Sequence, residues 1–221
     1  MAEFAAARRT LESMSIDTIA AAIENIGFSC TDCGACCRND EDPHVATVFP
    51  DEIRTIKEVT GTKWRDVARP MPFGLDETEA GDTFEWSLQS NSCGNCTFYD
   101  PDAPRGGCSI YADRPLICQT YPFQLAVPGV TEPNAAVTRT EGPVRAFDCE
   151  GLGRPISPEQ ARSLAVTLKS RARREIAESE SLLASYSGNL SEDRIVIHDS
   201  EGAKRPDGSR IHNDPHSTRY Y

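Results

Sequence analysis

The sequence predicts an α+β protein with a small irregular core of short strands and cysteine-bearing turns, flanked by N- and C-terminal helices. Segments towards both ends combine helical apolar periodicity with capping residues. The middle combines short alternating stretches, turn residues and all nine cysteines. We therefore expect an N-terminal helical segment (1–26), a cysteine-cluster domain (27–153), a C-terminal helix (154–190) and a polar, partly disordered segment (191–221).

The N-terminal segment is expected to be helical over residues 2–26. Ser15 is suited to cap the start of its second half, and Gly27 is suited to end it. Four isoleucines fall on one face of this helix: Ile16, Ile19, Ile23 and Ile26. The first cysteines therefore follow directly after a helix.

The middle of the chain is expected to hold short elements separated by turns. Pro50 opens a helix that runs through Val59 and ends at Gly61, and a shorter helix follows over 63–68. A single strand is expected over 83–88, where apolar and polar residues alternate. Further short strands are expected at 45–49, 97–99 and 108–111, with an irregular pair within 128–145.

The C-terminal helix has a well-marked start at Ser157-Pro158-Glu159-Gln160, with an N-cap, proline at N1 and glutamine at N3. It is expected to reach about Tyr186, and its Arg171–Arg174 run is interpreted as an exposed face. A strand is expected at 194–198. The chain from Asp199 onward is expected to be loose, apart from a turn at Pro206-Asp207-Gly208.

Composition limits the classes of function. The formal charge of −11 disfavours binding to phosphate backbones, so no nucleic-acid partner is expected. No apolar run has the length of a membrane span, and the first residues do not read as a signal peptide. We therefore expect a cytoplasmic protein without membrane insertion, in a compartment where thiols stay reduced. A redox or protein partner is left unidentified.

Four cysteines lie within eight residues, as Cys30-x2-Cys33-x2-Cys36-Cys37. Thiolates are soft ligands that favour zinc, copper(I) and iron–sulfur clusters. Zinc sites and iron–sulfur clusters both commonly take four cysteines, so the predicted core is metal-stapled. Adjacent Cys36 and Cys37 are expected to point in different directions, so that they serve two neighbouring metals or leave one thiol to packing. The remaining thiols are Cys93, Cys96, Cys108, Cys118 and Cys149.

The main hypothesis is an iron–sulfur protein, with a 4Fe–4S cluster among the forms considered, that has a redox or electron-transfer role. The alternative is a structural Zn²⁺ module without catalysis. Thiol-redox chemistry and a cluster-dependent modifying enzyme rank lower, because no thioredoxin-like βαβ pattern and no cosubstrate pocket is recognisable. No catalytic residue is assigned, and His44 is interpreted as a solvated loop residue rather than a ligand.

Three ordered motifs resemble the YkgJ-like CxxCxxCC cysteine-cluster family, which is associated with zinc or iron chelation. They are residues 28–37, residues 107–123 with Cys108 and Cys118, and residues 147–153 with Cys149. The resemblance covers about 26–153 and implies metal binding without defining the metal. Cys96 lies where members often carry a cysteine, and Cys93 looks like an addition. The implied ligand candidates are Cys30, Cys33, Cys36, Cys37, Cys96, Cys108, Cys118 and Cys149, with Cys93 less certain.

Overall fold

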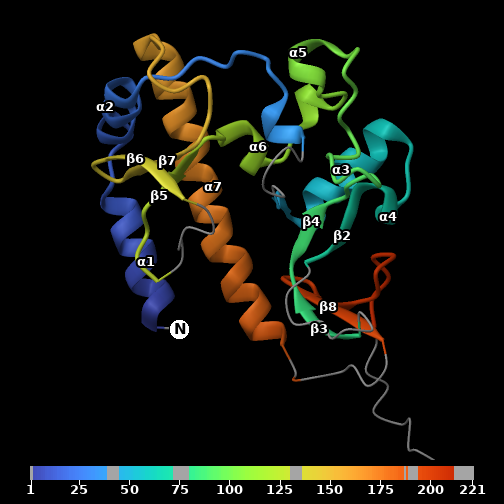
Figure 1. Cartoon of the computed structure of the whole chain (residues 1–221). Coiled ribbons are helices and arrows are strands. Elements are labelled where there is room, and N and C mark those ends of the chain that lie inside the picture. Colours follow the sequence, from blue (N-terminus) through green and yellow to red (C-terminus); the bar gives the residue numbers. More distant parts are fainter. Residues whose placement is uncertain are drawn as a thin grey trace, which may run out of the picture.

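The computed structural model describes residues 2–38, 45–71, 80–129, 136–186, 188 and 194–211. Within these residues the chain builds two hydrophobic cores that lie side by side (Figure 1). Helices at both ends of the sequence and small sheets between them give an α+β architecture, as predicted. The cysteine-bearing segments run between the two cores.

The first core is formed by three helices and one antiparallel sheet, whose strand order is β5-β7-β6. Ile19 and Ile23 are fully buried in it, which confirms the predicted apolar face. Ser15 accepts a hydrogen bond from the Thr18 N–H, and Gly27 ends the helix with φ +73°. The elements are α1 (Ala2–Ser13), α2 (Ile16–Ile26), α7 (Pro158–Ser185), β5 (Phe123–Leu125), β6 (Val137–Glu141) and β7 (Val144–Phe147).

The long helix α7 begins with the predicted capping box between Ser157 and Gln160. The interpretation of its arginines as an exposed face is wrong for Arg171, which is 8% exposed. The Arg171 guanidinium donates to Thr120 Oγ1 (3.0 Å) and pairs with Glu175 (2.7 Å). This arginine therefore ties α7 to the short helix α6 (Leu116–Thr120), which carries Cys118.

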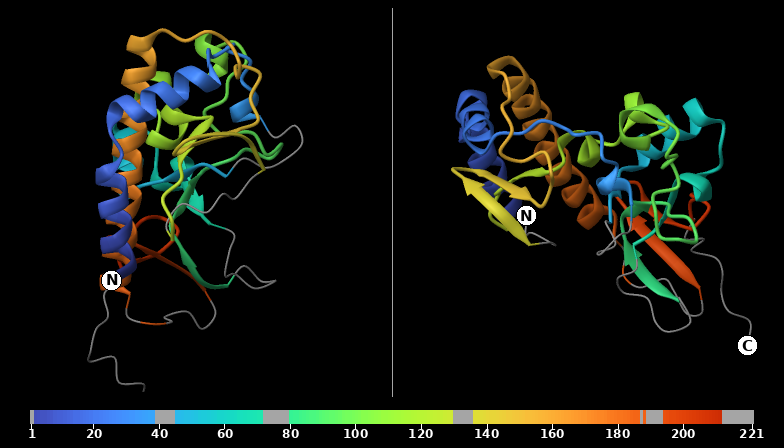
Figure 2. Two further views of the ribbon diagram at one scale, coloured as in Figure 1. Left: turned by 90° about the vertical axis from the view of Figure 1, so that its left-hand side faces the viewer. Right: turned by 45° about the horizontal axis from the view of Figure 1, so that its top comes forward.

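The second core lies under α3 and α4 and includes two further sheets, ordered β1-β4-β2 and β3-β8-β9. Trp64 and Trp86 meet edge-to-face in it, with ring centroids 5.2 Å apart. Strands β3 and β8 pair in parallel, although they are far apart in sequence (Figure 2). The elements are α3 (Pro50–Thr60), α4 (Trp64–Val67), β1 (Thr47–Val48), β2 (Ala68–Pro70), β3 (Gly81–Phe84), β4 (Trp86–Leu88), β8 (Ile195–Asp199) and β9 (Gly202–Lys204).

The predicted single strand at 83–88 is wrong. Glu85 has φ +66°, which breaks the strand and sends its halves into different sheets. The strands expected at 97–99 and 108–111 are reduced to one isolated bridge between Tyr99 and Cys108. Residues other than glycine and asparagine rarely adopt this backbone region, so a glutamate at position 85 does not signal the break.

The expectation of a loose chain from Asp199 onward is also wrong for the residues that follow directly. Strand β9 pairs with β8, and Lys204 is buried with its ammonium 2.8 Å from both Asp199 and Glu201. The predicted turn is confirmed, since the Gly208 N–H donates to Arg205 O (2.8 Å). Residues 189–193 and 212–221 lie outside the described residues, as does His44. No helix in the described part of the chain is long and apolar enough to cross a bilayer.

Candidate metal centre

The cysteines lie where the two cores meet. Phe28 and Leu152 pair across an isolated bridge and pack on the first core. Cys96, Cys108 and Cys118 pack against the second core. Figure 1 shows the blue segment after α2 crossing from the first core towards α5 (Pro104–Gly107) and α6. A metal held by both groups of thiols would therefore link the cores.

The adjacent cysteines lie in a short 3₁₀ helix, η1 (Ala35–Cys37). The Cys37 N–H donates to Gly34 O (2.9 Å), which closes this turn. The sulfurs of Cys36 and Cys37 lie 4.0 Å apart, so the expectation that these side chains point in different directions is wrong. Two sulfurs on one tetrahedral zinc ion, each at about 2.3 Å from the metal, would be about 3.8 Å apart. This spacing suits two ligands of a single ion.

Cys37 is the centre of a four-thiol set. Its thiol interacts with the thiols of Cys108, Cys36 and Cys96, and these contacts raise the pKa of Cys37 far above its usual range. The Cys96 N–H also donates to Cys37 O (2.8 Å), which fixes the second loop against the first. Backbone and side-chain contacts therefore bring three separate segments together at Cys37.

The same contacts favour thiolate at the neighbours of Cys37. Hydrogen bonding from Cys37 lowers the pKa of Cys108 to about 6 and that of Cys36 to about 7. The positive charge of Arg114 acts in the same direction on both thiols. Cys37 also lowers the pKa of Cys96. Because a metal binds the thiolate, the lowered pKa values favour binding through Cys36, Cys96 and Cys108. Cys37, in contrast, would have to lose its proton when the metal binds.

A second set of thiols lies beside the first. Burial raises the pKa of Cys149, and the charges of Cys33 and Cys30 add to this effect. Cys149 Sγ accepts a hydrogen bond from the Gly151 N–H (3.4 Å). The structure therefore gathers Cys30, Cys33 and Cys149 on the side of the first core.

The remaining two thiols differ in position. Burial raises the pKa of Cys118, with further contributions from Cys96, Cys36 and Cys108, which places Cys118 beside the four-thiol set. Cys93 is exposed, and none of the thiol interactions among the described residues includes it. Eight cysteines are thus gathered, and Cys93 is set apart from them.

The thiols lie near one another but do not form the complete coordination sphere of a metal ion. Among the described residues, no group of three or more His, Cys, Asp or Glu side chains has the arrangement needed to hold a metal ion. The chemistry and number of the thiols suit a soft metal, so metal binding would require them to move closer together than they lie here.

Two residues outside the cysteine set position its loops. Arg114 donates from Nε to Tyr111 O (2.9 Å) and stacks 3.5 Å from the Tyr111 ring centroid, so it caps a turn. Glu52 accepts from the Leu116 N–H (2.8 Å) and from the Phe49 N–H (2.9 Å). This carboxylate fixes the start of α6, and sequence reasoning missed it because its partner lies 64 residues away.

Gly34 sets the close approach of two cysteine loops. It has φ +72°, and a Cβ there would lie 2.7 Å from Gly106 O and 2.9 Å from Tyr99 Cε2. We expect Gly34→Ala to weaken metal binding about tenfold or more, because it separates Cys36 and Cys37 from Cys108. Metal competition with a chromophoric chelator measures this.

Gly61→Ala is the matched control, with φ +69° and no atom within 4 Å of the added Cβ. Both variants carry backbone strain of about 1–2 kcal/mol. Equal metal affinity in the two variants would contradict the role given to the close approach at Gly34.

Comparisons with known proteins give one match. The model of a family described as "CxxCxxCC: Putative zinc- or iron-chelating domain" matches residues 29–150, more than half of the chain. No curated protein and no solved structure matches this sequence. The matched range begins just before Cys30 and ends just after Cys149, so it contains every gathered thiol.

Proposed function

Because the chain belongs to the CxxCxxCC family of zinc- or iron-chelating domains, we propose that it binds one metal ion through Cys36, Cys37, Cys96 and Cys108. The observation that supports this choice is the position of Cys37, whose thiol interacts with those of the other three. The ion would close the junction between the two cores. Its binding free energy would then add to the stability of their association.

The proposed metal is Zn²⁺ in a structural, non-catalytic role. The 4.0 Å separation of the Cys36 and Cys37 sulfurs favours two ligands on one ion. In a 4Fe–4S cluster each cysteine binds a different iron, so neighbouring ligand sulfurs stand farther apart. Four thiolates also fill the coordination sphere of zinc, which leaves no open position for a substrate.

The second candidate is an iron–sulfur centre with a redox or electron-transfer role. The observation that favours it is the additional group of Cys30, Cys33 and Cys149, whose charges act on one another beside the first set. A 4Fe–4S cluster also takes four cysteines, but on four different irons, so it could draw its more widely spaced ligands from both sets. Residues 27–153 would be the metal-binding segment in either case, in a reducing compartment such as the cytoplasm.

Metal analysis of protein purified without oxygen tests both candidates. We expect about one zinc per chain and no absorption in the visible range. A brown protein that contains iron and a matching amount of acid-labile sulfide would support the iron–sulfur candidate instead of zinc. Neither zinc nor iron near stoichiometric amounts would contradict the proposed function as a whole.

The variant Cys149→Ser provides a second test that distinguishes the zinc candidate from the iron–sulfur candidate. A zinc ion on the four-thiol set should be retained in this variant, because Cys149 is not one of its ligands. A cluster that spans both sets should be lost or altered, with a change in its absorption spectrum. Loss of zinc from this variant would show that the proposed ligand set is wrong.

A further inference from the structure

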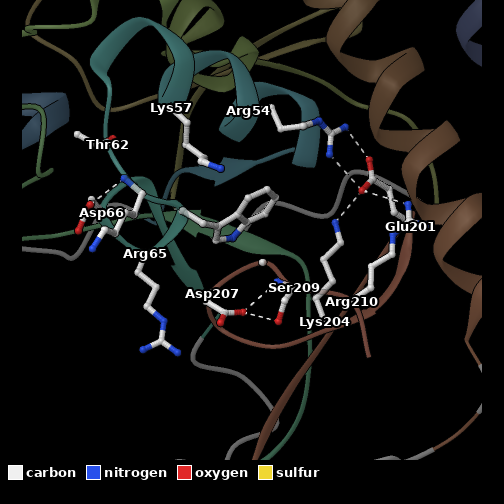
Figure 3. A pocket seen from close by; sticks show the side chains of 13 residues that line it. Arg54, Lys57, Thr62, Arg65, Asp66, Glu201, Lys204, Asp207, Ser209 and Arg210 are labelled. Carbon is white, nitrogen blue, oxygen red and sulfur yellow. Dashed lines mark hydrogen bonds and ion pairs between the residues drawn. The ribbon is translucent and has the colours of Figure 1, made fainter. Parts of the chain in front are cut away.

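A second site lies away from the cysteines, on the outer side of the second core. A groove of about 920 Å³ lies between the α3–α4 segment and the turn after β9. Figure 3 shows Lys57 and Arg65 on the α3–α4 side, with Lys204 and Arg210 opposite them. We propose that this groove binds a small anion bearing one or more phosphate groups.

The groove concentrates positive charge on an acidic protein. The chain has a net charge of −11 and lysine at only four positions, of which Lys57, Lys63 and Lys204 line the groove. Arginine lines it at three further positions, and acidic residues at three. This part of the surface is therefore positive, whereas the chain as a whole repels anions.

The acidic residues of the groove already have partners. Glu201 pairs with Arg54 (2.6 Å) and Lys204 (2.8 Å), and these cations lower the pKa of Glu201 to about 2. Asp66 accepts from the Lys63 backbone N–H (2.9 Å), and Asp207 accepts from the Ser209 backbone N–H (2.9 Å). These contacts hold the carboxylates in place, and the charge of Arg65 acts on Asp207 as well without forming an ion pair.

Three cations remain available to a ligand. In the described part of the chain, the side chains of Lys57, Lys63 and Arg65 form no ion pair. Lys63 and Arg65 are exposed, and Lys57 is half-buried. A carboxylate would satisfy one of these charges and a phosphate monoester at most two, whereas a diphosphate carries more charge and enough acceptor oxygens for all three.

The groove has a rigid aromatic floor. Trp64 is 7% exposed and lines it, with the ammonium groups of Lys57 and Lys204 at 5.8 and 5.2 Å from the ring. Gly208 packs so closely that a Cβ there would lie 2.4 Å from Trp64 Cδ2. The buried Trp64 Nε1 has no hydrogen-bond partner among the described residues. The floor therefore holds two lysines in place and carries an unused donor.

The size of the groove suits a metabolite rather than a macromolecule. Small-molecule sites commonly enclose about 300–1,000 Å³, and this groove lies within that range. A long nucleic acid would extend past the groove onto the negatively charged surface. The ligand class is therefore a compact phosphate, either inorganic diphosphate or the diphosphate of a nucleotide.

Isothermal titration calorimetry of the metal-loaded protein with inorganic diphosphate and with ADP tests this proposal. We expect binding of at least one probe below about 1 mM, weakening as salt is added. Tighter binding of ADP would identify a nucleotide as the source of the phosphate, and equal binding would identify the phosphate groups alone. No binding of either probe, or tighter binding of a single-stranded oligonucleotide than of ADP, would overturn the proposal.

Arg65→Glu and the double variant K57A/R65A are expected to weaken binding about tenfold or more, because charge-assisted hydrogen bonds are lost. Arg9→Glu in α1 changes the net charge equally at an exposed arginine far from the groove, and should bind as the parent does. Equal affinities in Arg65→Glu and Arg9→Glu would contradict the site. Metal content should be the same in all these variants, so this test is independent of the metal assignment.

Discussion

Cys37→Ser is expected to abolish stoichiometric metal binding. Its thiol interacts with three other cysteines, so its loss removes the centre of the proposed donor set. Serine leaves a hydroxyl that binds soft metals poorly. The variant also forgoes the stabilisation of about 3 kcal/mol that a ligand provides at 100 times its Kd. Metal analysis and urea unfolding in the presence of free zinc measure the two effects.

Cys93→Ser is the matched control for this substitution. Cys93 is exposed and takes no part in the thiol interactions of the described residues. We expect it to keep its metal and to unfold at the same urea concentration as the parent. Full metal occupancy in Cys37→Ser, or an equal loss in both variants, would contradict the assignment of Cys37.

Lys204→Met is expected to lower the free energy of unfolding by about 3–5 kcal/mol, because it leaves a buried carboxylate without its counter-charge. The Lys204 ammonium lies 2.8 Å from Asp199, which is 3% exposed. Asp199 also accepts from Trp86 Nε1 (2.8 Å), so the lost charge pair lies against the second core. Equilibrium urea unfolding of the metal-loaded protein measures the change.

The control for this substitution is Lys63→Met, at an exposed lysine in the same part of the fold. It should change stability by less than about 0.5 kcal/mol, as surface substitutions usually do. A double variant, K204M/D199N, removes both charges and should recover part of the stability. If Lys204→Met unfolds like Lys63→Met, the buried pair does not contribute to stability as argued.

The helices could be predicted because their signals are local. Ser157 and Gln160 form a capping box within four residues, and the isoleucine face of α2 repeats at helical spacing. The errors occurred where tertiary contacts decide the structure. The positive φ at Glu85 divides a stretch that reads as one strand, and the burial of Lys204 depends on Asp199 and Glu201.

The candidate site could be predicted in composition but not in arrangement. Cysteine spacing predicted the candidate ligand types, and the family match contains every gathered thiol. The separation of Cys37 and its partners from the group around Cys149 follows from loops that approach through Gly34 and Gly151. The basic groove was missed because its lysines are single residues in separate elements, and net charge alone pointed away from any anion.

The parallel pairing of β3 with β8 has a consequence for biosynthesis. During synthesis, residues 81–84 have no β8 strand to pair with until residues 195–198 have been produced. The second core, which supports Cys96, Cys108 and Cys118, is therefore incomplete while the ribosome is still producing the intervening chain. A metal bound as proposed would therefore gain the support of the complete second core only after residues 195–198 have been synthesised.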